Sequence, residues 1–383
     1  MKKCRIAYLI DTISCDTSGT EKQLLETIER IDKEKFSPHL ICLYESSWMR
    51  EHPLSCHYTA LGYRGLLKIN LFGVLKKLRQ LLADENFQIV QTFFEDSIFV
   101  VWLATMFNRR NVVLLSSRRD LGLGEGNQPW YHKLFAMALP VANTGFDGIV
   151  ANSLQVKEYA ATRERTSRDK IEVVYNGVEI PEKAKKPPAV LETDSTVLWI
   201  AIVASLTPVK RHDMLINAIA RLCGNLQGQK MRVLVLGKGP DKEKLVRLAQ
   251  QKNVQEFFHF EGAVHNVSDY LQHVDVGVLC SDREGFSNAI LEYMANGLPV
   301  IATAVGGNVE LVDDDNGRCV PAGDPAALAE ALHELVTDQQ KRQRMGLVSR
   351  KRVAERFSWR GSMLHLEGYY QKMMTQKGLA GDQ

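Results

Sequence analysis

The chain has 383 residues, of which 45% are apolar and 24% charged, and its formal net charge is +3. A chain of this length is longer than one that ordinarily folds around a single hydrophobic core. The length and composition therefore predict a soluble globular protein of two domains. The small net charge gives no argument for nucleic acid as a partner, and no stretch approaches the roughly 20 apolar residues of a membrane-spanning helix.

The cysteines and the N-terminus predict a cytoplasmic protein. Seven cysteines are scattered along the chain without a Cys-x-x-Cys pair, and their odd number favours reduced thiols over a disulfide framework. The N-terminus is basic and then apolar, but Asp11 interrupts the apolar run after a few residues. We therefore interpret this run as a first β-strand and not as a signal peptide.

In the first half of the chain, short apolar runs alternate with helical patterns, which predicts a parallel sheet covered on both faces. The expected strands are Cys4–Ile10, Ser37–Leu43, Ile89–Thr92, Val112–Ser116, Gly148–Ala151 and Ile171–Val174. The expected helices are Glu21–Ile31, Leu66–Leu82, Ser97–Phe107, Trp130–Ala142 and Leu154–Ala161. The run from Pro181 to Pro188 is rich in Pro and Lys and predicts the interdomain linker.

The second half repeats the alternation without an obvious sequence repeat. Its expected strands are Val197–Val203, Arg232–Leu236, Phe257–Phe260, Asp275–Cys280, Pro299–Thr303 and Arg318–Val320, with helices between them. A last helical stretch with aromatic residues follows at Phe357–Met374. The fold class is therefore α/β, with two Rossmann-like, doubly wound parallel sheets. We expect domains at 1–181 and 191–356, a linker at 182–190 and a final helical segment at 357–383.

The stretch from Glu284 to Glu292 is the strongest candidate site. It lies where a buried strand turns into a short helix that ends at Gly297, at the edge where open α/β sheets bind ligands. Ser287 or Asn288 can cap this helix, whose free amides suit an anion such as a diphosphate. Glu284 in the loop and Glu292 in the helix can accept hydrogen bonds from two hydroxyl-bearing parts of one ligand. The alternative is two surface glutamates on an amphipathic helix.

The residues from Asp282 to Thr303, followed by Gly306–Glu310, resemble the donor-binding segment of the retaining glycosyltransferases of the GT-B fold, glycosyltransferase family four. The resemblance covers nearly the whole chain and is sharpest from Ser205 to Glu310. It implies two Rossmann-like domains that face each other across a cleft and a last helix that crosses back onto the first domain. It also implies a hexosyltransferase that moves a sugar from a nucleoside diphosphate, such as UDP, to an acceptor with retention of configuration.

The resemblance assigns most of the donor site. Lys210, which follows the first strand of the second domain, would hold the diphosphate and neutralise the departing charge. Glu284 would hold the sugar, and Glu292 the ribose. We expect Lys210 and Glu284 to be catalytic, and the other donor-binding residues to be Gly19, Ser205, Arg211, Gly237, Val264, Phe286, Ser287, Asn288, Ala289 and Glu292.

Several of these assignments have an ordinary alternative. Lys210 could be a solvated lysine, and Gly19 could be a turn glycine where the family has two glycines. Ser205 stands where the family commonly has Arg, so either Lys210, with Arg211 nearby, carries more of the charge or a neighbouring residue supplies it. The loop at Gly237 has an incomplete glycine fingerprint, which we interpret as a tight loop lining the nucleotide cleft and not as an oxidoreductase motif. Val264 follows a segment that resembles the family's nucleobase wall.

No metal or other cofactor is expected. Asp313–Asp315 could be mistaken for a metal-binding acidic motif, but the following Asn-Gly favours a turn before the next strand. The ten histidines show no ligand spacing.

Two basic features of the first half suggest anionic partners. Arg118 and Arg119 stand near a position where the family often has His, which suggests contact with an acceptor or sugar that carries extra negative charge. The alternative is a pair of solvated arginines. The basic, amphipathic run Arg64–Leu82 suggests a helix on an anionic membrane, at the inner face of the cytoplasmic membrane, or else an ordinary core-packed helix.

The predicted function is transfer of a sugar to a glycan or lipid-linked acceptor in the assembly of cell-surface polysaccharide or another glycoconjugate. The alternatives are an epimerase or phosphorylase of the same two-lobed form, and a non-catalytic nucleotide-sugar sensor. Incubation with the nucleotide sugar alone identifies an epimerase, which needs no acceptor, and turnover distinguishes an enzyme from a sensor.

Overall fold

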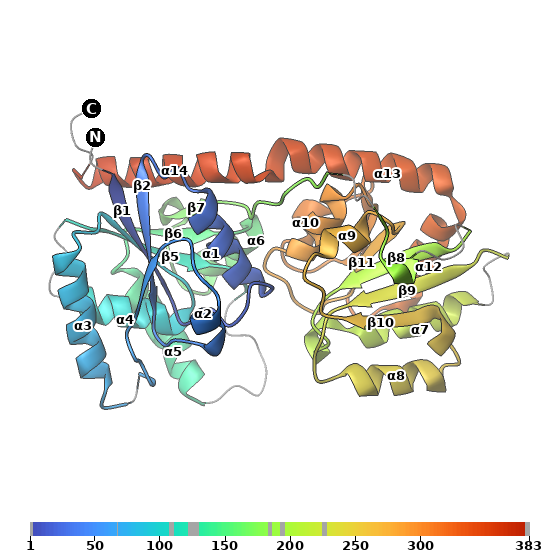
Figure 1. The fold of residues 1–383 in the computed structure, drawn as a ribbon, viewed down its shortest axis with the longest axis horizontal. Helices are drawn as coiled ribbons and strands as arrows, with labels where there is room; N and C mark the ends of the chain where they lie inside the picture. The colour runs from blue at the N-terminus through green and yellow to red at the C-terminus, as the bar shows by residue number, and fades with distance from the viewer. Residues whose placement is uncertain are drawn as a thin grey trace. The chain divides into compact units, whose positions relative to one another are not determined.

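The computed structural model describes residues 3–66, 68–106, 111–121, 130–182, 186–191, 196–223 and 228–379. The chain forms two compact units, the first comprising Met1–Asn176 with Ser362–Gln383 and the second Gly177–Gly361. Each unit is built around one parallel sheet with helices packed on it (Figure 1). The contacts change from one unit to the other at Asn176, before the boundary expected at residue 181, because Val178 already pairs with Ser358.

The sheet of the first unit has seven parallel strands in the order β3-β2-β1-β4-β5-β6-β7. They are β1 (Cys4–Ile10), β2 (Phe36–Cys42), β3 (His57–Ala60), β4 (Ile89–Thr92), β5 (Val113–Arg118), β6 (Gly148–Ala151) and β7 (Ile171–Val173). The helices are α1 (Gly19–Arg30), α2 (Ser47–Glu51), α3 (Leu71–Asp84), α4 (Glu95–Thr105), α5 (Trp130–Asn143) and α6 (Leu154–Thr162). The central strands are buried, which explains why they read as continuous apolar runs.

Different elements cover the two faces of this sheet. Alternate residues of a strand point to opposite faces. Ala7 and Leu9 of β1 share a hydrophobic cluster with residues of α3, α4 and α5. On the other face, the hydroxyl of Tyr370 in α14 (Trp359–Gln376) donates to that of Tyr8 at 3.2 Å. The end of the chain therefore completes the core of the first unit.

The sheet of the second unit has six parallel strands in the order β10-β9-β8-β11-β12-β13. They are β8 (Leu198–Val203), β9 (Met231–Leu236), β10 (Phe258–Gly262), β11 (Val276–Leu279), β12 (Val300–Thr303) and β13 (Gly317–Val320). The helices are α7 (His212–Leu222), α8 (Lys242–Gln251), α9 (Val267–Leu271), α10 (Asn288–Ala295), α11 (Asn308–Leu311), α12 (Pro325–Thr337) and α13 (Gln339–Arg352). The order reverses direction at β8, so the ends of β8 and β11 mark the switch point where such sheets bind ligands.

The predicted fold class is confirmed, and so are the predicted strands, with limits that shift by at most two residues. Two short elements were not predicted: α2 and the edge strand β3, whose residues are half-buried or exposed. The helix expected from Leu66 begins only at Leu71. Residues 183–185 of the expected linker and residues 122–128 of the Gly-rich loop after Leu121 lie outside the described part of the chain.

Candidate functional site

The loop after β8 brings Lys210 to the carboxyl edge of the second sheet. A short 3-10 turn, Pro208–Lys210, follows the buried Leu206, and Arg211 then adopts a left-handed φ of 49° before α7 begins. Ser205 is exposed at the base of this loop, and its hydroxyl lies 3.3 Å from that of Thr207. The cation therefore sits at the end of a constrained turn and not on a free helix surface.

The neighbouring loop after β9 packs backbone against backbone on this turn. Gly237 has a φ of 149°, and a Cβ there would lie 2.0 Å from the carbonyl oxygen of Ala204. The Gly237 amide also donates to the carbonyl of Gly262 at 2.7 Å, which joins this loop to the one after β10. Val264, half-buried, lies two residues beyond Gly262. Gly237 therefore serves close packing of three loops at one edge, which supports its interpretation as a tight loop.

Lys210 and Glu284 form an ion pair. The Lys210 ammonium lies 2.6 Å from Oε1 of Glu284, and the Ser281 hydroxyl donates to the same oxygen at 2.5 Å. The two loops are also joined by the Asp282 amide, which donates to the carbonyl of Val209 at 2.8 Å. The Lys210 side chain is 24% exposed and that of Glu284 11% exposed, so an anion that reaches this lysine must compete with a carboxylate already in place. Sequence reasoning gave the two residues different parts of a donor and did not predict their contact.

The loop that carries Glu284 requires the glycines of the next connection. Gly306 has a φ of 50°, and a Cβ at that position would lie 1.7 Å from the carbonyl oxygen of Glu284. The adjacent Gly307 amide donates to the carbonyl of Gly285 at 2.8 Å. The Gly306-Gly307 pair thus sets the position of the loop that carries Glu284. No pattern within that loop predicts this role.

Helix α10 begins directly after this loop. Of the two possible caps, Ser287 has this role, because its hydroxyl accepts from the Ile290 amide at 3.3 Å. The ring of Phe286 is buried and packs 5.7 Å from that of Phe357. Asn288, Ala289 and Glu292 are half-buried on the first turns, and their spacing places them on one side of the helix.

Tyr293 holds α10 against the sheet and was not predicted as a site residue. Its hydroxyl accepts from the Val203 amide at 2.6 Å and donates to the Val278 carbonyl at 3.1 Å. A Cβ at Gly277 would lie 2.4 Å from its ring. The residue after Glu292 is therefore anchored at the ends of β8 and β11. A glycine inside an apolar strand was the available signal, because it marks a close approach.

Arg211 does not add free positive charge to the site. Its guanidinium lies 3.0 Å from a carboxylate oxygen of Asp213 and 3.0 Å from one of Asp282. The hydrogen bonds to Asp213 are the main cause of its raised pKa. Arg211 thereby ties the turn to the loop after β11, and its contact with an anion of the donor stays a prediction.

Gly19 lies in the first unit, at the start of α1. Its preceding residue, Ser18, is the N-cap without a side-chain cap hydrogen bond. The loop before it is held by the buried Glu21, which accepts from the amides of Ser14 and Cys15 at 2.7 and 3.0 Å. Gly19 thus sits beside an ordered loop at the carboxyl end of β1, and its contact with a phosphate stays a prediction.

The interpretation of Arg118 was wrong in both forms, since the residue is neither solvated nor available to an acceptor. It is buried, and its Nε donates to both carboxylate oxygens of Glu164 at 2.9 Å while Nη2 donates to Asn143 at 2.8 Å.

Arg119 is half-buried, donates to Oδ1 of Asn176 at 2.8 Å and lies over the ring of Phe93. Burial lowers the pKa of Arg119 to about 10, and its contact with a substrate stays a prediction.

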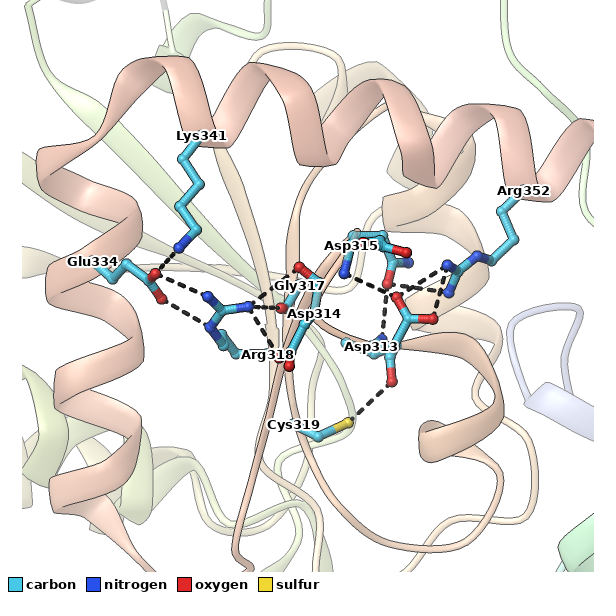
Figure 2. A network of polar contacts seen from close by, with 11 residues as sticks. Asp313, Asp314, Asp315, Gly317, Arg318, Cys319, Glu334, Lys341 and Arg352 are labelled. Carbon is cyan, nitrogen blue, oxygen red and sulfur yellow. Dashed lines mark hydrogen bonds and ion pairs between the residues drawn. The ribbon is translucent and has the colours of Figure 1, made fainter.

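The acidic run 313–315 forms a turn in which the first two carboxylates face separate arginines (Figure 2). Asp313 lies 2.9 Å from Arg352, and Asp314 lies 3.1 Å from Arg318. These pairs agree with the turn interpretation.

In the described part of the chain, no group of three or more His, Cys, Asp or Glu side chains is arranged to hold a metal ion. Among the same residues, no helix has both the length and the apolarity to cross a bilayer.

Both halves of the chain match known protein families. Residues 17–181 match the model described as Glycosyltransferase Family 4, and residues 184–352 match the model described as Glycosyl transferases group 1.

Three curated proteins are similar in sequence. The N-acetyl-alpha-D-glucosaminyl L-malate synthase of Bacillus anthracis is 27% identical over 195 residues (49% of this chain, 50% of that protein). The putative colanic acid biosynthesis glycosyltransferase WcaL of Escherichia coli K12 is 34% identical over 184 residues (45% and 44%). The N-acetylgalactosamine-N,N'-diacetylbacillosaminyl-diphospho-undecaprenol 4-alpha-N-acetylgalactosaminyltransferase of Campylobacter jejuni is 23% identical over 333 residues (85% and 89%). The first two matches thus span about half the length of each relative.

Solved structures share the fold along nearly the whole chain. A glycosyltransferase of Rickettsia africae has a TM-score of 0.82 at 19% identity, covering 98% of this chain and 99% of its own. Anabaena HepE in complex with UDP has a TM-score of 0.78 at 17% identity, covering 96% and 100%. At such identities the likeness shows the fold alone.

Proposed function

Because the chain belongs to the GT-B glycosyltransferases of family 4 type, we propose that it transfers a hexose-type sugar from a nucleoside-diphosphate sugar to a hydroxyl-bearing acceptor. The observation that carries this proposal is the Lys210–Glu284 pair beside the N-terminus of α10. A cation, a carboxylate and a helix N-terminus at the switch point of a parallel sheet suit a phosphate next to a sugar.

The donor is held by groups with separate tasks. The ammonium of Lys210 and the first amides of α10 bind the diphosphate, where charge grows as the sugar bond breaks. The carboxylate of Glu284 binds sugar hydroxyls once the diphosphate has taken its place beside Lys210. Glu292, one turn into α10, accepts from the ribose. UDP is the first candidate nucleotide, which the binding of UDP by Anabaena HepE supports.

The transfer proceeds with retention of configuration. Among the described residues at the head of α10, no side chain is an obvious covalent nucleophile. The leaving diphosphate oxygen instead accepts the proton of the acceptor hydroxyl on the same face of the sugar. Lys210 supplies the positive charge that stabilises this oxygen, so the reaction needs no metal ion.

The acceptor is a glycan or a lipid-linked glycan of cell-surface polysaccharide assembly, at the inner face of the cytoplasmic membrane. Support comes from the described roles of the relatives, which include colanic acid biosynthesis and transfer to a diphospho-undecaprenol acceptor.

A thermal-shift panel of nucleotide sugars tests the donor. A ligand that binds only the folded protein raises its melting temperature, by an amount that grows with its concentration relative to Kd. We expect one UDP-sugar to stabilise the wild type most and to stabilise Lys210→Ala much less. Lys244→Ala, which removes an exposed lysine of α8 in the same unit, away from the proposed donor site, is the matched control.

The same donor then identifies the reaction. Release of UDP that depends on an added acceptor and survives EDTA is the expected result. Conversion of the donor without an acceptor would instead identify an epimerase, and binding without turnover would identify a sensor.

A further inference from the structure

The segment between β3 and α3 exposes two large apolar side chains. Ile69 is 93% exposed and Phe72 is 80% exposed, the highest values among the exposed large hydrophobic residues that the structure describes. They are three positions apart, just before and within the first turn of α3 (Figure 1). Two such side chains in water carry a cost that burial against an apolar phase removes.

The apolar stripe of α3 itself is not available to a partner. Val74, Leu75 and Leu78 are buried in the hydrophobic cluster of the first unit. The helix is therefore core-packed, which corrects the expectation that the amphipathic run Arg64–Leu82 lies along a membrane. Ile69 and Phe72 point away from this core.

The exposed pair stands on an ordered base. Tyr63 is buried, and its hydroxyl donates to Asp96 at 2.8 Å. The side-chain amide of Asn70 donates to the carbonyl of Gly62 at 2.8 Å, which closes the segment just before the helix. Ile69 and Phe72 are thus presented by a braced loop, so little conformational entropy is lost when they are buried.

The charged residues nearest to the pair in the sequence are all cationic. No acidic residue occurs from Leu61 to Ala83. Arg64, Lys68 and Lys76 are exposed, and within the described part of the chain none of them forms an ion pair. The neighbouring Lys77 donates to the carbonyl of Ala60, so its ammonium is already engaged.

We propose that this tip, defined by Arg64, Lys68, Ile69, Phe72 and Lys76, docks on an anionic lipid bilayer. Ile69 and Phe72 enter the boundary between headgroups and acyl chains, and the three cations lie at the level of the lipid phosphates. Two exposed apolar side chains, flanked in the sequence by cations that form no ion pair in the described part of the chain, match such a surface in both polarity and charge. The inference rests on the proposed function only in that a lipid-linked acceptor gives the docking a use.

Vesicle co-sedimentation of the full chain tests this docking without any substrate. Vesicles of phosphatidylcholine with roughly a third phosphatidylglycerol are compared with pure phosphatidylcholine. We expect binding to the anionic vesicles that weakens as salt rises. Ile69→Ser with Phe72→Ser should lower the partition coefficient roughly tenfold or more, because two apolar side chains no longer insert. Lys68→Gln with Lys76→Gln should lower it on anionic vesicles only.

Met137→Ser is the matched control, because it removes a comparably exposed apolar side chain (76% exposed) from α5 of the same unit. Equal loss in this control, unchanged binding in the Ile69/Phe72 variant, or equal partition of the wild type to neutral vesicles would overturn the proposal. UDP-induced thermal stabilisation of the Ile69/Phe72 variant is measured in parallel. If this variant no longer binds vesicles but is still stabilised by UDP, the docking surface is lost while the donor site is intact.

Discussion

At the residue scale, the candidate site contains a cation, Lys210, whose charge is already balanced by a carboxylate. Lys210 already has a carboxylate at 2.6 Å, and the Ser281 hydroxyl holds that carboxylate in place. The arrangement keeps the ammonium oriented, but it also sets a competition between Glu284 and the donor diphosphate. Arg211 faces the same kind of competition, since its guanidinium is paired with Asp213 and Asp282.

Removing the ammonium should affect the chemical step most. Lys210→Ala should lower kcat by roughly 10²–10³, the loss typical of one pre-organised electrostatic contact to developing charge. Glu284→Gln should also lower kcat, because Glu284 contacts the moving sugar. The same variant should keep or slightly increase the affinity for UDP, because the lysine loses its internal competitor.

Glu292→Gln provides the contrast in the same steady-state assay. The charge of the ribose does not change during the reaction, so this variant should mainly raise the donor KM and leave kcat nearly unchanged. Isothermal titration with UDP completes the comparison. Normal turnover of Lys210→Ala, or loss of UDP binding in Glu284→Gln but not in Glu292→Gln, would show that the donor is placed wrongly.

At the element scale, α10 is positioned from three directions. Ser287 caps it, and Tyr293 joins it to the ends of β8 and β11. Gly306, which has no Cβ, allows the loop of Glu284 that precedes α10 to pack closely against the loop after β12. The sequence predicted the helix, its limits and a cap at Ser287 or Asn288, because capping and strand-to-helix signals are local. It did not predict the roles of Tyr293 and Gly306, because these depend on contacts between segments distant in sequence.

The difference between local sequence signals and contacts between distant segments also explains which other predictions were right and which were wrong. Buried strands such as β1 were predicted because their apolar runs are continuous, whereas the edge strand β3 has no such run. Arg118 was misinterpreted because its partner Glu164 lies 46 positions away, and no local pattern marks a buried ion pair.

Gly306→Ala tests the contact that sets Glu284. A Cβ 1.7 Å from the Glu284 carbonyl must displace that loop, in addition to the cost of a left-handed φ of 50°. We expect a loss of about 1–3 kcal/mol in the free energy of unfolding and a fall in kcat. Gly323→Ala is the control, since it has a φ of 74° with nothing nearer than 4.0 Å. It should cost only about 1 kcal/mol and leave kcat unchanged, and a similar fall in kcat in both variants would contradict the idea.

At the scale of the whole molecule, each unit contains a buried titratable group near the carboxyl edge of its sheet whose pKa is shifted toward neutrality or away from it. In the first unit, burial raises the pKa of Asp11 to about 7, an effect reinforced by Asp96 and Glu95 and opposed by its hydrogen bonds from Ser97. In the second unit, burial lowers the pKa of His212 to about 4, with Lys210 acting in the same direction and Asp213 and Asp241 opposing. Among the described residues, neither ring nitrogen of His212 has a hydrogen-bond partner.

The two shifts predict opposite pH dependences for the two units. An acid whose pKa is raised on folding binds protons more tightly when folded, so Asp11 makes the first unit less stable as the pH rises from about 4 to 7. A base whose pKa is lowered on folding has the reverse effect, so His212 makes the second unit more stable as the pH rises from about 4 to 6.5. Lowering the pH from 7.5 to 5 should therefore strengthen the first unit and weaken the second, each by an amount on the order of 1–3 kcal/mol.

Amide hydrogen exchange read separately in β1–β7 and β8–β13 measures this divergence, after correction for the intrinsic effect of pH on exchange. Asp11→Asn should reduce the pH dependence of the first unit only, because the amide does not titrate but can still accept from Ser97. His212→Phe should reduce that of the second unit only, because it keeps an aromatic ring without a titrating nitrogen. If both variants keep the wild-type pH dependence in their own unit, other groups dominate the stability of the two units and the assignment fails.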